Sequence, residues 1–199
     1  MKRRIFLLSA FGFLVGCDET ITIQIKPSRC PDDTCPETPP ADCPYKAVPP
    51  MDLPVELRES NYGSGGSCVH ASMVACLRWQ NLHKLADWWR GRYSGGEGIG
   101  GLASKAEAAG LRFAYTRQGD SQFLEWCSRT RRGAVIFYYE NHSIVFCGFV
   151  GNEAVVMDNN RVDRLTRIPK QDFIRRWRSY GGVALTPVYS PDPPRPWVG

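Results

Sequence analysis

The chain has 199 residues, of which 43% are hydrophobic and 23% are charged. These values are ordinary for a soluble globular protein and exclude a chain that is disordered throughout, while the length fits one domain with extra segments. The formal net charge is +5, but Lys2, Arg3 and Arg4 supply more than half of that excess. Charge therefore gives no argument for a nucleic-acid partner, and we expect none.

Residues 1–17 have the pattern of an export signal. The basic start MKRR precedes an apolar run over 5–15, which is too short to span a bilayer as a helix. Leu14-Val15-Gly16-Cys17 then resembles the lipobox of bacterial lipoproteins, in which the cysteine is lipidated and becomes the new N-terminus. The resemblance implies an exported protein anchored to a bacterial membrane through acyl chains on Cys17. A plain signal peptide or a short N-terminal anchor is the alternative.

Residues 18–54 are predicted to be a linker. Nine prolines lie between Pro27 and Pro54, with few large apolar residues among them, so this stretch predicts a stiff, extended spacer. No proline occurs from 55 to 168, and residues 55–189 are therefore predicted to be the folded domain. Residues 190–199 form a second proline-rich segment, predicted to be an irregular tail.

Three cysteines, Cys30, Cys35 and Cys43, fall in the predicted linker. Exported proteins meet oxidising conditions, so we expect a disulfide between two of the three. No histidine lies nearby to complete a zinc set, and we predict no metal site.

The domain is predicted to contain helices first and most of its sheet later. Apolar periodicity and end signals indicate helices over 68–77, 82–93, 102–109, 121–131 and 170–179. Runs of β-branched and aromatic residues indicate strands over 134–139, 143–150, 154–157 and 183–189. Helices packed on an antiparallel sheet give an α+β domain.

Single residues refine these predictions. Ser67 and Asp120 are expected to cap the helices that follow them, and Pro169 is expected at the first position of the helix over 170–179. Gly151-Asn152 predicts the turn between the strands over 143–150 and 154–157. Pro187 suggests that the last strand lies at a sheet edge.

Cys68 stands out because it lies at a predicted helix N-terminus, where the helix dipole favours a thiolate. The glycine-rich stretch 63–67 before it allows backbone amides to approach a substrate closely. A nucleophilic cysteine also needs a base, and the chain has three histidines. His70 shares the helix of Cys68 and should point elsewhere, while His83 should lie on a solvated helix face.

His142 is the remaining candidate base, because it stands just before a predicted strand. The hairpin that turns at Gly151-Asn152 should bring Asp158 or Asn160 back beside it, since paired strands place such positions opposite one another. Either side chain can orient an imidazole.

The stretch Gly63-Ser64-Gly65-Gly66-Ser67-Cys68 resembles the approach to the nucleophile in papain-type enzymes. The order of a cysteine helix, later strands, a histidine and then an aspartate resembles the papain-like cysteine peptidase superfamily. Within it, the bacterial domains that process double-glycine bacteriocin leaders are the most similar. The resemblance covers about residues 61–189 and implies a papain-like fold, with the nucleophile helix packed on a C-terminal antiparallel sheet.

The resemblance also implies roles for individual residues. Cys68 would attack a carbonyl carbon and form a thioester, and His142 would take and return the proton. Asp158, or alternatively Asn159 or Asn160, would orient the imidazole ring.

The oxyanion site departs from the family pattern. The family places a glutamine six residues before the nucleophile, where this chain has Tyr62 with Asn61 before it. A Tyr hydroxyl or an Asn amide donates the same kind of hydrogen bond, so Asn61 or Tyr62 is the expected donor beside the backbone N–H of Cys68.

The sequence thus predicts a membrane-tethered thiol hydrolase, a peptidase or amidase acting on a peptide or amide substrate without a cofactor. The first alternative is an inactive lipoprotein that uses the same fold as a binding or envelope-structural module. Another is different acyl chemistry on the same residues, such as transglutaminase-type transfer or hydrolysis of cell-wall peptides. Nothing in the pattern indicates an oligomeric state.

Overall fold

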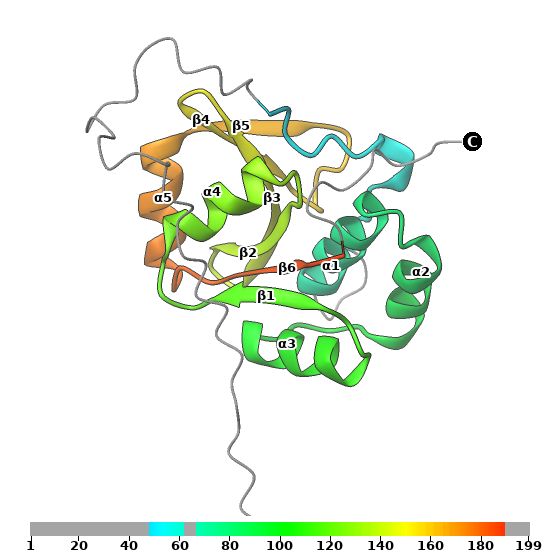
Figure 1. The fold of residues 1–199 in the computed structure, drawn as a ribbon. Helices are drawn as coiled ribbons and strands as arrows, with labels where there is room; N and C mark the ends of the chain where they lie inside the picture. Colours follow the sequence, from blue (N-terminus) through cyan, green and yellow to red (C-terminus); the bar gives the residue numbers. More distant parts are fainter. Residues whose placement is uncertain (1–47, 62–66, 190–199) are drawn as a thin grey trace, which may run out of the picture. The chain divides into compact units, whose positions relative to one another are not determined.

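The computed structural model describes residues 48–61 and 67–189 (Figure 1). The predicted features at Cys17, Cys30, Cys35, Cys43 and Tyr62 lie outside these ranges. No helix within the described ranges is both long enough and apolar enough to cross a membrane.

Helices and strands follow the predicted order. The helices are η1 (Val55–Leu57), α1 (Cys68–Trp79), α2 (His83–Arg92), α3 (Ile99–Ala108), α4 (Ser121–Arg129) and α5 (Lys170–Ser179). The strands are β1 (Phe113–Thr116), β2 (Ala134–Tyr139), β3 (His142–Val150), β4 (Glu153–Met157), β5 (Leu165–Pro169) and β6 (Ala184–Pro187). The five predicted α-helices and four predicted strands are confirmed, with ends that differ by at most three residues.

The strands form one sheet in the order β1-β6-β2-β3-β4-β5, and every neighbouring pair is antiparallel. β3 and β4 form the predicted hairpin, in which Val150 pairs with Glu153 across a two-residue turn. Gly151 has φ +55 in that turn, a conformation that glycine adopts without steric cost. The predicted α+β class is confirmed.

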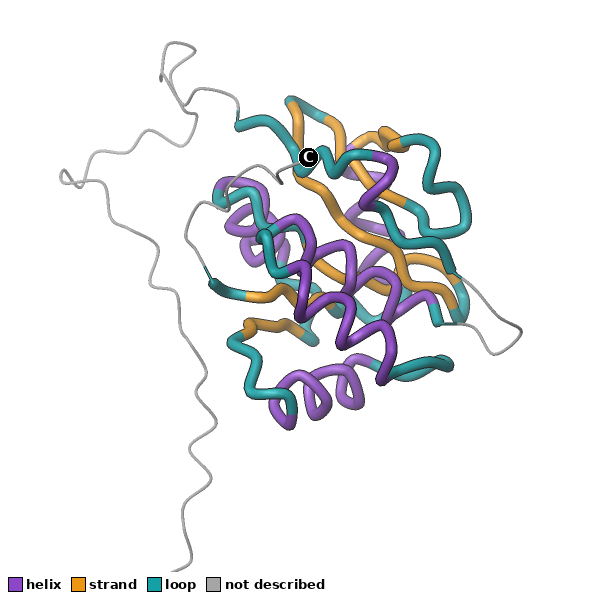
Figure 2. Tube along the Cα trace, turned by 90° about the vertical axis from the view of Figure 1, so that its right-hand side faces the viewer, coloured by secondary structure: helices purple, strands orange, loops and turns teal. Residues whose placement is uncertain are grey.

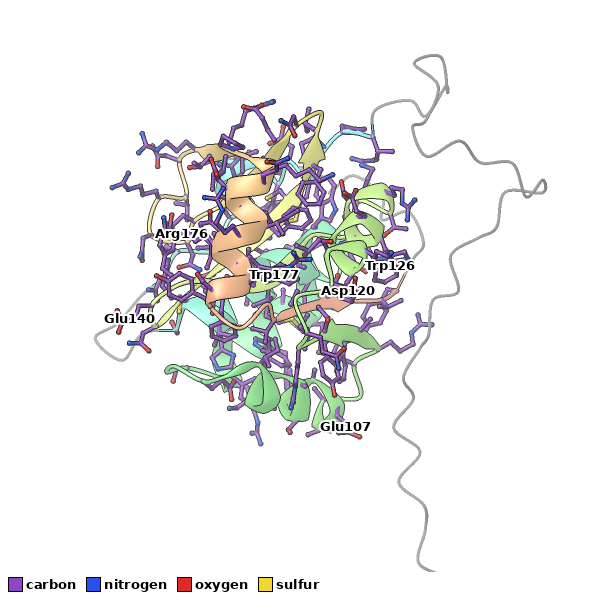
Figure 3. The ribbon with its side chains drawn as sticks, turned by 90° about the vertical axis from the view of Figure 1, so that its left-hand side faces the viewer. Glu107, Asp120, Trp126, Glu140, Arg176 and Trp177 are labelled. Carbon is purple, nitrogen blue, oxygen red and sulfur yellow. The ribbon has the colours of Figure 1, made fainter. Side chains whose placement is uncertain are left out.

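Helices cover both faces of the sheet, as Figures 1 and 2 show. Alternate residues of the central strands point to opposite faces, so Val135 and Val145 pack with α1, α2 and α3. Ile136 and Phe146 pack on the other face with Phe123 of α4 and with α5. Figure 3 shows α5 on this second face, with Trp177 labelled, and that indole is fully buried. Burial on both faces explains why β2 and β3 read as continuous apolar runs.

α1 is the most deeply buried helix of the domain. Each of its residues from Cys68 to Leu77 is buried, not only the apolar stripe of Val69, Met73 and Leu77. A helix buried on all sides must be covered on all sides, and α1 contacts α2, β2 and β3. The start of α1 is therefore held in place by core packing.

β6 is an interior strand, so the prediction that Pro187 marks an edge was wrong. Pro187 is the last residue of β6 and pairs with Phe113 of β1, while pairing with β2 ends at Leu185. The N–H of Val188 donates to Arg112 on the β1 side, so the missing N–H of Pro187 faces the β2 side, beyond the last paired residue. The proline therefore removes no ladder hydrogen bond.

β1 and β5 were not predicted, and they are the two edge strands of the sheet. Both are short, and β5 is only partly buried, so neither shows a strong period-two pattern. Pro169 ends β5 and occupies the N-cap position of α5, one residue earlier than expected.

The folded domain begins before residue 55, which corrects the predicted end of the linker at Pro54. Met51 and Leu53 are fully buried in the core cluster that contains α1. The Met51 N–H also donates to the Cys147 carbonyl of β3 at 2.8 Å. Two isolated apolar residues among prolines show no periodicity, so the sequence pattern did not distinguish them from linker.

We expect Leu53→Ala to lower the free energy of unfolding by about 2–5 kcal/mol, because it leaves a cavity in the core. Val55→Ala is the matched control: Val55 is 48% exposed, and its truncation should change stability by no more than about 0.5 kcal/mol. Urea unfolding of the two variants measures both values. Equal, small effects would show that residues 51–54 are not part of the folded domain.

Candidate active site

Cys68 is the first residue of α1, at the positive end of the helix dipole. Ser67 occupies the N-cap position, but its side chain makes no capping hydrogen bond, so the predicted capping role was wrong. Its backbone N–H instead donates to Oδ1 of Asn61 at 3.0 Å. Cys68 is 6% exposed, so its thiol lies just below the surface.

His142 and Asp158 lie at the open end of the β3–β4 hairpin. His142 is the first residue of β3, and Asp158 directly follows the last residue of β4, Met157. Antiparallel pairing of the two strands brings these side chains together, and His142 Nε2 is 2.9 Å from Asp158 Oδ1. The sequence-predicted approach of Asp158 to His142 is thus present in the fold.

The Cys68 thiol and the His142 ring are near enough for each to shift the pKa of the other. Because Nε2 faces Asp158, Nδ1 is the ring nitrogen available to the thiol. The backbone N–H of Ser143 also donates to Cys68 Sγ at 3.3 Å. The sulfur therefore lies between an imidazole and a backbone donor, both of which favour a thiolate.

These contacts change the protonation of all three side chains. Burial disfavours the Cys68 thiolate, but hydrogen bonds from His142 and Ser143 outweigh it and lower the pKa of Cys68. The hydrogen bond to Asp158, followed by the one to Cys68, raises the pKa of His142 to about 9. Burial opposes ionisation of Asp158, yet the bond to His142 holds its pKa below the usual value. The arrangement favours a thiolate–imidazolium pair next to a carboxylate.

The other two candidate orienting residues have different contacts. Asn160 Nδ2 lies 3.3 Å from His142 Nε2, but an Nε2–H that donates to Asp158 has no lone pair for this amide. The Asn160 backbone N–H donates to Asp158 Oδ1 at 2.9 Å, which supports the carboxylate. Asn159 is buried, and its amide contacts Cys68 O, Ser72 Oγ and Ser143 O.

Asn61, a predicted oxyanion donor, lies next to the start of α1. Its Oδ1 accepts the Ser67 N–H, and its Nδ2 donates to Asn160 Oδ1 at 3.2 Å. An amide has two N–H donors, and among the described residues Asn160 accepts one of them. The contribution of Asn61 to an oxyanion site stays a prediction.

The other two histidines lie outside this cluster. His70 is 1% exposed; its Nδ1 accepts the Trp89 indole N–H at 3.2 Å, and its Nε2 lies 2.9 Å from Glu97 Oε1. Burial lowers the pKa of His70, although Glu97 opposes the shift, so His70 stays neutral in the core. His83 begins α2 and is partly exposed.

The structure adds contacts that the sequence did not indicate. The Ser143 N–H is a backbone donor, which no residue type specifies, although its place directly after His142 is a usable signal. The Tyr139 ring lies 5.9 Å from the His142 ring, and the Arg176 guanidinium lies 4.5 Å from the Tyr139 ring. Among the residues described, no group of three or more His, Cys, Asp or Glu side chains is placed to hold a metal ion.

Two solved structures resemble this chain. One is a double-glycine motif protease from an AMS/PCAT transporter in complex with its leader peptide, with TM-score 0.50, 19% identity, and 70% of this chain and 94% of that chain covered. The other is the peptidase domain of Streptococcus ComA, a bifunctional ABC transporter of a quorum-sensing pathway, with TM-score 0.52, 16% identity, and 66% and 97% coverage. No protein-family model matches the chain, and no curated protein does. At these identities the likeness establishes the fold, and the predicted papain-like architecture is confirmed.

We expect Asp158→Asn to lower the pKa of His142 from about 9 toward the ordinary value of about 6.5, because the bond to Asp158 is the main cause of the increase. Titration of the His142 ring followed by NMR measures this change. Asp163→Asn is the matched control, because Asp163 is exposed on the same loop and should leave the titration unchanged. An unchanged titration in Asp158→Asn would contradict the geometry described above.

Proposed function

We propose that this chain is a thiol hydrolase, a peptidase or amidase, with Cys68 as nucleophile, His142 as general base and acid, and Asp158 as the residue that orients His142. The observation that carries the proposal is the connected series of contacts from Asp158 through His142 to a thiol with a lowered pKa. The position of that thiol at a helix N-terminus adds further stabilisation of the thiolate.

The chemistry follows from these positions. The Cys68 thiolate attacks the carbonyl carbon of the substrate, and the electron pair of the C=O bond moves to its oxygen. His142 gives its proton to the leaving nitrogen as the C–N bond breaks, which leaves a thioester on Cys68. His142 then takes a proton from water, the resulting hydroxide attacks the thioester, and the acid and the thiolate are released.

The developing oxyanion needs hydrogen-bond donors. The Cys68 N–H has no carbonyl partner within its own helix, because it belongs to the first turn of α1. We propose that it acts together with Asn61 or Tyr62. Loss of one such donor lowers the rate by about 10²–10³-fold in other enzymes. The rate of this site should therefore depend strongly on the Cys68 N–H and on the donor from Asn61 or Tyr62.

We propose a peptide as the substrate. The similar double-glycine motif protease was solved with a leader peptide, and its fold is the one seen here. A single domain that presents a thiolate just below its surface is suited to an extended chain that lies across the start of α1.

We also propose that the domain is exported and held on a bacterial membrane by acyl chains on Cys17. Support comes from the sequence alone: the basic start, the short apolar run and Leu14-Val15-Gly16-Cys17 occur in the order of a lipoprotein signal. The proline-rich residues that follow would separate the domain from the bilayer.

Alkylation by iodoacetamide tests the proposed nucleophile and base. Cys68 in the full chain should react well below pH 8.5, the ordinary range of a free thiol, and His142→Ala should slow the reaction at pH 6 by about 10²-fold. His83→Ala is the matched control and should react like the unaltered protein. Mass spectrometry of the peptide that contains Cys68 gives the rates. A Cys68 that reacts as an ordinary thiol in the unaltered protein would refute the enzyme and favour a binding module.

Hydrolysis of peptides that contain a Gly-Gly sequence should require both Cys68 and His142. Cys68→Ala should lower the rate by at least about 10³-fold, whereas Cys76→Ala, a change of a buried cysteine on the same helix, should retain activity. The rate should fall as the pH rises through about 9, because His142 then loses the proton that it must give to the leaving nitrogen. A rate that keeps rising above this pH would contradict the assigned role of His142.

When bacterial cells that express the full chain are grown with an alkyne-bearing palmitate analogue, the protein should become labelled. Cys17→Ala should abolish the label. Cys30→Ala changes a cysteine in the predicted linker and should keep it. Label that persists in Cys17→Ala would rule out lipidation at this position.

A further inference from the structure

We propose that Asn159 is a positioning residue, which sets the nucleophile helix α1 against the strand that carries the base. The inference rests on the proposed function of Cys68 and His142, and it assigns Asn159 a role other than orienting the imidazole. Its basis is a set of contacts that join the two halves of the site.

The Asn159 amide connects the residues next to the reacting groups. Its Nδ2 lies 3.0 Å from the Cys68 carbonyl and 2.9 Å from the Ser143 carbonyl. Both oxygens can only accept, so the two N–H groups of the amide satisfy one carbonyl each. Cys68 carries the nucleophile at the start of α1, and Ser143 directly follows the base in β3. Ser72 Oγ, one turn further along α1, lies 3.0 Å from the same nitrogen.

The Asn159 backbone ties a third segment to the same point. Its carbonyl accepts the N–H of Asn61 at 2.7 Å, and Asn61 in turn accepts the N–H of Ser67 through Oδ1. The residue before Asn159 is Asp158, the partner of His142. One buried residue thus links the orienting carboxylate, the base strand, and the chain that leads into α1.

Ser143 connects the position of β3 relative to α1 with the reactivity of the Cys68 thiol. Its N–H donates to Cys68 Sγ at 3.3 Å, while its C=O accepts from Asn159. A slide of β3 relative to α1 would lengthen both the Ser143 N–H to Sγ contact and the contact between the thiol and the imidazole. Charge-assisted hydrogen bonds weaken steeply with distance and misalignment, and a shift of about 1 Å in a catalytic site can cost about 10²-fold in rate.

The residue type suits this position. An aspartate would direct oxygens at two carbonyl oxygens, which repel it, and an alanine would remove the amide donor from both carbonyls. Leucine has the same number and branching of side-chain heavy atoms as asparagine and donates nothing, so Asn159→Leu removes the hydrogen bonds without opening a cavity.

Gln80 provides a matched control. It is a second buried amide, 5% exposed, at the other end of α1. Its Nε2 donates to the Pro187 carbonyl at 2.8 Å, and its Oε1 accepts the Tyr189 N–H at 3.2 Å. Gln80→Ala therefore also breaks a buried link between α1 and the segment at β6, but far along the helix from Cys68.

The experiment compares the pH dependence of Cys68 alkylation in the full chain for Asn159→Ala, Asn159→Leu and Gln80→Ala, with a thermal melt of each. Both Asn159 variants should raise the apparent pKa of alkylation toward about 8.5 and slow the reaction at pH 6 by at least about 10-fold. Gln80→Ala should lower the melting temperature to a similar extent and change the rate by less than about 2-fold. If Asn159→Ala is unfolded at the assay temperature, the folded Asn159→Leu gives the same reading.

The outcomes separate this inference from the proposed function. A folded Asn159 variant that keeps the alkylation profile of the unaltered protein would overturn the positioning role alone and leave a structural role. A Gln80 variant that shifts the profile as much as the Asn159 variants would also overturn it, because the effect would then follow stability. An ordinary thiol profile in the unaltered protein would overturn the proposed function together with this inference.

Discussion

The site depends on the burial of α1. The first ten residues of this helix are all buried, between α2 on one side and β2 and β3 on the other. Such a helix cannot rotate or slide far without opening the core, so apolar packing sets the approximate position of its N-terminal cysteine. β3 begins with the histidine at the same end of the domain. An apolar contact between a helix and a strand thereby brings the two halves of a polar site together.

The features predictable from sequence are those with a local physical cause. Apolar periodicity predicted the helices, and Gly151-Asn152 between two apolar runs predicted the β3–β4 hairpin. A hairpin has a defined register, so the proximity of Asp158 to His142 followed from counting along two strands. The roles proposed for Cys68, His142 and Asp158 rest on the chemistry of a thiol, an imidazole and a carboxylate.

The features that escaped prediction depend on contacts between distant segments. Leu53 is a lone apolar residue among prolines, and only the assembled core shows that it belongs inside. The edge strands β1 and β5 are short and depend on neighbours for their hydrogen bonds. The contacts of Asn159 join α1 to β3, and residue type alone did not distinguish an orienting amide from one that bridges two carbonyls. The prediction that Pro187 marks a sheet edge was wrong because the side of the strand on which the proline lacks an N–H depends on the strand register.

The attachment of Met51 has a mechanical consequence. The chain enters the domain there, through a hydrogen bond to Cys147 of β3 and a side chain buried beneath it. A pulling force on the residues before Met51 would therefore act first on β3, in the middle of the sheet, and not on an edge strand. The same strand begins with His142, so a pull strong enough to displace Met51 would reach the imidazole through a single stretch of β backbone. Force that enters the domain at Met51 would thus pass into the strand that carries His142.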